Sequence, residues 1–168
     1  MAESGSAAGI TGPVLLGVVP HQPAIVLRRA ADLALSAGVE LVCAYVDVAS
    51  YPVPGDAAGA AQPIDPDGVD DDAGPIAEGI RSRIAAELGG LPLAWRFVTL
   101  AGQPARALAH HADAIDAAMI VVGTHEGRLG ARLEELLASS VAVHLTHRQG
   151  RPVLVVPLSP AMLPHHDG

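Results

Sequence analysis

Lysine is absent from this 168-residue chain, so all ten of its basic residues are arginines. Eighteen acidic residues outnumber them, the formal net charge is -8, and only four residues are aromatic. A protein that binds nucleic acid needs a broad basic face, and one that binds single strands needs aromatic rings on which bases stack. We therefore expect no nucleic-acid partner and a core built from aliphatic side chains.

Cysteine and long apolar runs are also scarce. Cys43 stands alone inside the apolar run Leu41–Val46, which predicts a small buried hydrophobic residue rather than a nucleophile or metal ligand. No apolar run reaches the roughly 18 residues of a membrane span, and residues 1–13 lack the basic and apolar parts of a signal peptide. We expect a cytoplasmic protein with no membrane partner.

Short apolar runs alternate with helical patterns along most of the chain. The order of these segments predicts a three-layer α/β/α sandwich with a five-stranded, mostly parallel sheet. Strands are expected at residues 14–19, 39–46, 93–100, 119–122 and 153–156. Helices are expected at 24–37, 75–88, 104–115 and after residue 130, running past 141.

The domain boundaries follow from changes in composition. We expect a flexible N-terminus over residues 1–13, one domain over 14–158 and a C-terminal tail over 159–168. Residues from about 50 to 75 are rich in proline, glycine and aspartate and show no apolar periodicity, which predicts a mobile acidic insertion. Its replacement by a short linker should change the melting temperature by only a few degrees.

The segment Met119–Pro157 is the most informative part of the sequence. It reads as a buried strand, a loop with several glycines, a helix and a second apolar strand, which is the order of a parallel β-loop-α-β unit. Ligands bind at the carboxyl ends of such strands, where glycine lets backbone N–H groups approach phosphate oxygens and a helix start adds partial positive charge. This segment predicts a nucleotide site.

Three stretches carry a resemblance to a known family: the opening strand Val14–Val18, the segment Leu100–Leu108 leading into Ile120–His125, and the end from Ser139–Val141 through Arg151–Val156. Together they resemble the universal stress protein family, whose members are flavodoxin-like or adenine nucleotide α-hydrolase-like. The resemblance implies an ATP site of the pattern G-x-x-G, nine residues, G-[ST]. It also implies a homodimer through the last strand, Val153–Val156, whose apolar edge exposes backbone groups that seek pairing.

The resemblance assigns nucleotide-binding positions to this chain with three departures from the family pattern. Val19 stands where the family has an aspartate for ribose or adenine, Ser139 replaces the last glycine, and Glu126 falls at the second glycine. Val46 matches the valine that packs near the base. The assigned positions are Val19, Pro20, Val46, Gly123, Thr124, His125, Gly127, Gly130, Ser139, Ser140 and Val141.

No nucleophile and base pair, G-x-S-x-G elbow or Walker lysine is found in the sequence, so we expect no enzyme. The adjacent His110 and His111 lack a convergent carboxylate or cysteine and are interpreted as solvated, and no metal site is expected apart from Mg²⁺ carried with ATP. The leading hypothesis is a regulatory module that weakly binds ATP, AMP or cyclic AMP. The alternatives are a stress-response dimer without nucleotide and, third, a slow ATP hydrolase.

Overall fold

The computed structural model describes residues 9–52, 61–63, 73–124, 141, 145–146 and 150–157. Apart from two short strands within residues 50–63, strands and helices alternate from residue 14 to residue 123, as the sequence predicts. In chain order they are β1 (Val14–Val18), α1 (Ala24–Ala37), β2 (Leu41–Asp47), β3 (Ser50–Pro52), β4 (Ala61–Pro63), α2 (Ala73–Leu88), β5 (Trp95–Ala101), α3 (Pro104–Ala114), β6 (Met119–Gly123) and β7 (Val153–Val156).

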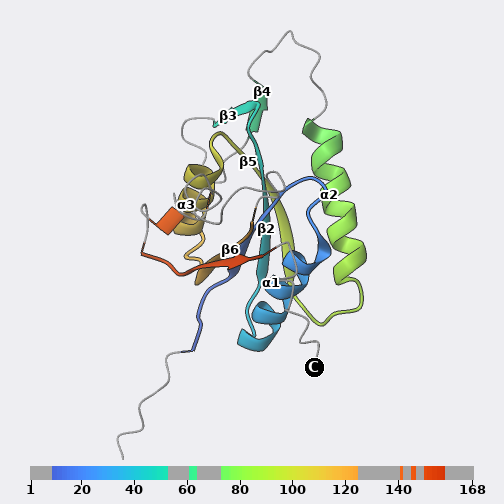
Figure 1. Cartoon of the computed structure of the whole chain (residues 1–168), viewed down its shortest axis with the longest axis vertical. Coiled ribbons are helices and arrows are strands. Elements are labelled where there is room, and N and C mark those ends of the chain that lie inside the picture. Colours follow the sequence, from blue (N-terminus) through green and yellow to red (C-terminus); the bar gives the residue numbers. More distant parts are fainter. Residues whose placement is uncertain are drawn as a thin grey trace, which may run out of the picture.

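The main sheet has five strands in the order β5-β2-β1-β6-β7, and every neighbouring pair is parallel. The chain builds the sheet outward from β1 through β2 to β5, then crosses back to place β6 on the other side of β1 (Figure 1). The order of strands therefore reverses between β1 and β6. In open α/β sheets, the crevice beyond the carboxyl ends of the strands at such a reversal is the usual ligand site.

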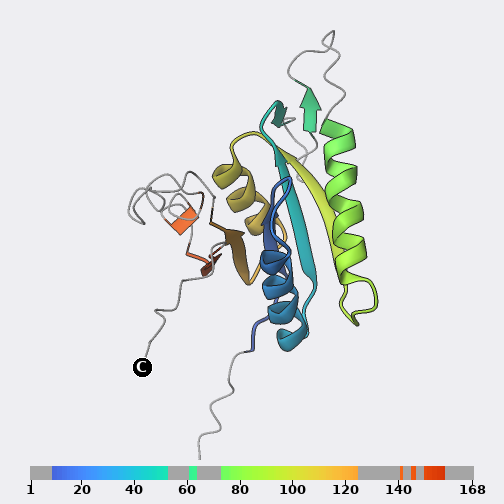
Figure 2. The ribbon, with the colours of Figure 1, turned by 45° about the vertical axis from the view of Figure 1, so that its right-hand side comes forward.

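Helices cover both faces of the sheet, which confirms the three-layer sandwich. Figure 2 shows α3 on one side of the sheet and α2 on the other. One apolar cluster joins α1 and α2 to Leu16, Cys43 and Tyr45, and a second joins α3 to Leu15 and Val42. Adjacent strand residues therefore alternate between the two clusters, as expected for strands that are buried on both faces.

Helix α1 begins and ends where the sequence predicts. Its last residue, Ala37, is followed by Gly38 in the left-handed conformation at φ 67°, and the Gly38 N–H bonds back to the Leu35 carbonyl at 3.1 Å. Glycine adopts this conformation without a Cβ penalty, so the helix stops there.

The insertion between β2 and α2 contains two elements that the sequence analysis did not anticipate. Strands β3 and β4 pair antiparallel, with Ser50 opposite Pro63, and both strands contact β5. The predicted mobile insertion spans residues from about 50 to 75, and its residues 53–60 and 64–72 lie outside the described residues. The predicted fourth helix is described only at Val141 and Leu145–Thr146, which are helical.

Candidate nucleotide site at the carboxyl edge of the sheet

The carboxyl ends of β1, β2 and β6 bring four of the predicted site residues to one edge of the sheet. Val19 and Pro20 follow β1, Val46 is next to last in β2, and Gly123 ends β6. The parallel register places β1 between β2 and β6, so these residues lie on adjacent strands. Three loops therefore converge where the order of strands reverses.

Gly123 and Thr124 are held by the edge strand β7. Gly123 lies opposite Val156 in the register, and the Thr124 N–H donates to the Val156 carbonyl at 3.0 Å. The last strand thus positions the start of the predicted phosphate loop. The remaining predicted loop residues, His125, Gly127 and Gly130, lie outside the described residues, as do Ser139 and Ser140. Val141 is half-buried and packs against the apolar cluster beneath α3.

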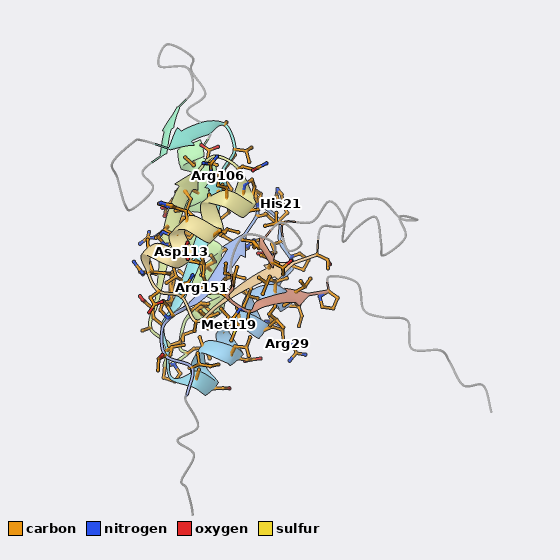
Figure 3. The ribbon with its side chains drawn as sticks, turned by 90° about the vertical axis from the view of Figure 1, so that its left-hand side faces the viewer. His21, Arg29, Arg106, Asp113, Met119 and Arg151 are labelled. Atoms are coloured by element: carbon orange, nitrogen blue, oxygen red, sulfur yellow. The ribbon has the colours of Figure 1, made fainter. Side chains whose placement is uncertain are left out.

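Two helices begin at this edge without a side-chain cap. The N-cap residues are Pro23 for α1 and Gln103 for α3, and neither helix has an acidic residue in its first turn. The backbone N–H groups at a helix start carry partial positive charge, and a capping oxygen or carboxylate normally satisfies them. Figure 3 shows Arg106, in the first turn of α3, and His21, after β1, at this same end of the molecule. The described part of the edge therefore favours a bound anion.

Asp47 is a buried carboxylate at the end of β2, but its oxygens are already engaged. One accepts a hydrogen bond from the Ala49 N–H at 3.0 Å, and the other accepts from the Ser50 hydroxyl. Burial, and then the charge of Asp47, raise the pKa of the neighbouring Tyr45 above its usual value. Asp47 thus closes the turn into β3 and does not replace the missing aspartate at Val19.

Two apolar side chains at this edge are exposed. Val19 is 43% exposed, and Val48, just after β2, is 68% exposed. Val46, which the resemblance assigns to the base, is half-buried and pairs with Leu100 of β5. The edge therefore combines an apolar surface with two uncapped helix starts, a combination suited to a ligand with a flat apolar part and an anionic part.

A cavity of about 210 Å³ lies beside the edge and was not foreseen from the sequence. It is formed between α1 and α2, and its lining includes Val18, Gln22, Leu27, Arg83 and Glu87. None of the predicted site residues lines it. The cavity forms where α1 packs against α2, so it depends on tertiary structure and no local sequence motif predicts it.

The interpretation of the two adjacent histidines is wrong for one of them. His110 is exposed, but His111 is only 5% exposed, and its Nε2 is buried without a hydrogen-bond partner among the described residues. Burial, and then the charges of Arg96 and His110, lower the pKa of His111. Helical spacing could have predicted this, since His111 falls in the apolar stripe with Leu108 and Ala112.

Cys43 is fully buried, and burial raises the pKa of its thiol to about 12, so the predicted structural role is supported. Within the described ranges, no group of three or more His, Cys, Asp or Glu residues could hold a metal ion. No helix in the described part of the chain is long and apolar enough to cross a membrane.

The family model described as "Universal stress protein family" matches residues 12–157. The chain belongs to the universal stress protein family. That match spans every element of the main sheet, from β1 to β7. No curated protein matches the chain.

Solved universal stress proteins share the fold at low sequence identity. One from Archaeoglobus fulgidus in complex with dAMP is 21% identical, with 87% of this chain and 98% of that chain covered and a TM-score of 0.60. One in complex with cAMP is 19% identical, covering 88% and 98%, also with a TM-score of 0.60. An Arabidopsis thaliana family protein with AMP bound is 14% identical, covering 93% and 98%, with a TM-score of 0.54.

Proposed function

We propose that this universal stress protein is a regulatory module that binds an adenine nucleotide weakly at the carboxyl edge of its sheet. The observation that carries the proposal is the convergence of the β1, β2 and β6 loops with the uncapped start of α1. The structural relatives described as complexes with cAMP, dAMP and AMP support adenine as the base. If ATP is the ligand, we expect it to bind with Mg²⁺.

We propose binding rather than turnover. The buried carboxylate at the described edge, Asp47, already accepts hydrogen bonds from Ala49 and Ser50, so it is poorly placed to activate water. A valine occupies position 19, so a charge-assisted hydrogen bond to ribose is missing there. We expect a dissociation constant between micromolar and millimolar, which corresponds to roughly -8 to -4 kcal/mol.

The test is calorimetry of the full chain with ATP, AMP and cyclic AMP at fixed magnesium and salt. Gly123→Val should abolish binding because it adds a side chain where β6 ends and the predicted phosphate loop begins. The matched control is Gly150→Val, which makes the same change before β7, where a Cβ meets no atom within 4 Å. Wild-type protein that gives no heat with any of the three nucleotides would contradict the proposal.

A second role, as a homodimer, is favoured by one feature of β7. This strand forms an edge of the main sheet, and Leu154 on it is 40% exposed. An apolar edge strand with unpaired backbone groups is a template for pairing with a second copy. Light scattering at micromolar concentration should give the dimer mass for wild-type protein and the monomer mass for Leu154→Asp, with Leu91→Asp as an exposed apolar control outside the strand. A dimer that persists in Leu154→Asp would locate the interface elsewhere.

A further inference from the structure

His21 has an unusual backbone conformation at the candidate site. Among the described residues other than glycine, only His21, at φ 58°, and Asp116, at φ 50°, have positive φ. His21 is the third residue of a four-residue turn that the Gln22 N–H closes onto the Val19 carbonyl at 3.3 Å. With Pro20 in the second position this is a type II turn, in which the third position is normally glycine. A histidine there carries a steric cost that glycine would avoid.

The turn holds the His21 side chain at the carboxyl edge of the sheet. The side-chain amide of Gln22 donates to the Gly17 carbonyl at 3.4 Å, which anchors the turn to β1. His21 itself is exposed, and Figure 3 shows it at the same end of the molecule as Arg106. The next element, α1, begins only three residues later, at Ala24, and its start is uncapped. His21 therefore lies in the short loop that joins the carboxyl end of β1 to the uncapped start of α1.

We propose that His21 is a phosphate-contacting residue whose imidazole N–H donates a hydrogen bond to a phosphate oxygen of the bound nucleotide. The proposal rests on the nucleotide-binding function above. The β1 turn is adjacent to the end of β6, where Gly123 and Thr124 begin the predicted phosphate loop. A glycine in the turn would fold with less strain but would supply no donor. The backbone strain at His21 is thus offset by the hydrogen bond that its side chain donates to the phosphate.

The experiment uses two variants that relieve the same strain at opposite edges. His21→Gly and Asp116→Gly each replace a residue of positive φ, and both should raise the melting temperature by a few degrees. Asp116 precedes β6, at the amino edge of the sheet, and its side chain is 97% exposed, so the loss of its ion pair with Arg151 should cost little stability. Only His21→Gly should weaken ATP binding, by about tenfold, measured by calorimetry at fixed magnesium and salt.

Two further comparisons identify the contacted part of the nucleotide. Adenosine, which has no phosphate, should bind wild type and His21→Gly equally in ligand-observed NMR. His21→Asn should retain part of the ATP affinity, because asparagine tolerates the left-handed conformation and its amide can donate.

Each contrary result has a distinct meaning. ATP affinity unchanged in His21→Gly would overturn the role of His21 and leave the nucleotide site standing. An equal loss for ATP and adenosine would move the contact to the nucleoside and overturn the phosphate assignment. A lower melting temperature for His21→Gly would show that the fold itself requires the histidine. Wild type that binds no nucleotide would overturn both proposals together.

Discussion

The two edges of the main sheet differ in how far side chains of the protein bind their polar groups. At the amino edge, Arg151 donates to the Ala117 carbonyl at 2.7 Å and also binds Asp113 and Asp116, and Arg96 pairs with Glu40 at 3.4 Å. These contacts tie β7 to α3 and β5 to the start of β2. Side chains of the protein close the amino edge. At the carboxyl edge Asp47 is engaged by Ala49 and Ser50, but the described starts of α1 and α3 have no capping side chain and leave backbone donors for a ligand.

Exposed apolar residues occur at both edges, since Ile10 before β1 and Leu91 before β5 are 42% and 43% exposed. Val19 and Val48 end the carboxyl side of β1 and β2, and both are exposed. Burying them would favour the fold by roughly 25 cal/mol for each Å² removed from water, so their exposure is a cost that a bound ligand can recover. Substitutions at the amino edge should therefore change stability without changing binding, whereas those at the carboxyl edge should change binding.

Gly12 should give the largest effect on stability. Its φ is 109°, and a Cβ built on it would lie 2.4 Å from the Asp116 carbonyl oxygen, which is a backbone atom and cannot easily move. We expect Gly12→Ala to lower the free energy of unfolding by about 3 kcal/mol in urea titrations, because strain and overlap act together. Gly38→Ala is the control, since Gly38 has φ 67° but open space around its Cβ, and should cost only about 1 kcal/mol. Equal losses of stability in Gly12→Ala and Gly38→Ala would show that the protein shifts to remove the overlap with the Asp116 carbonyl oxygen.

Arg151 comes next. Arg151→Met removes the hydrogen bond to the Ala117 carbonyl and leaves that partly buried oxygen without its charged donor. We expect a loss of about 2 kcal/mol in the free energy of unfolding, while ATP affinity stays unchanged. Arg81→Met removes only an exposed pair with Glu78 and should be close to neutral. A change in ATP affinity for Arg151→Met would break the separation between the two edges.

The fold was predictable because its signals are local. Helix α1 has both a stripe of buried residues, such as Val26 and Ala30, and a terminating Gly38, so its bounds were predicted without error. Strand β7 was predicted as well, since an apolar run of four residues after a proline leaves few alternatives. Strands β3 and β4 were missed because their three-residue pairing depends on contact with β5, and neither has an apolar pattern of its own.

The site was predictable only in outline. The meeting of Val19, Val46 and Gly123 at one edge follows from parallel strands, and the structure places them there. The strain at His21 was not predictable, because a dipeptide of proline and histidine does not by itself specify a type II turn. The engagement of Asp47 by Ser50 also depends on the tertiary path of the chain into β3.

At the carboxyl edge, Val19→Asp should change ATP affinity. A carboxylate at the end of β1 restores the family pattern and can accept a hydrogen bond from a ribose hydroxyl, so ATP affinity should rise about tenfold, or about 1.4 kcal/mol. Val48→Asp is the matched control, because it adds the same charge at an exposed valine after β2, away from the predicted ribose position. We expect no gain from the control in calorimetry. Weaker ATP binding in both variants would mean that charge repulsion governs this edge.

The smallest effect is expected at His111, which differs from the bonded polar groups at the amino edge described above. Its Nε2 is buried without a partner in α3, and the nearby charges that act on it are those of Arg96 on β5 and of His110. The folded-state pKa is lowered, so as pH falls below the ordinary value near 6.5 the unfolded chain takes up this proton before the folded protein does. Protonation therefore favours unfolding, and stability is lost on acidification.

Urea unfolding of wild type and His111→Leu at pH 7.5 and 5.5 measures this dependence. Wild type should lose more stability between the two pH values than His111→Leu, because the variant has no group at this position to protonate. His110→Leu is the control, since it makes the same substitution at the neighbouring, exposed histidine of α3. An identical loss in wild type and His111→Leu would show that protonated His111 is accommodated in the folded state. His111 would then be no exception, and the contrast between the amino and carboxyl edges would hold for all the described polar groups of the amino half.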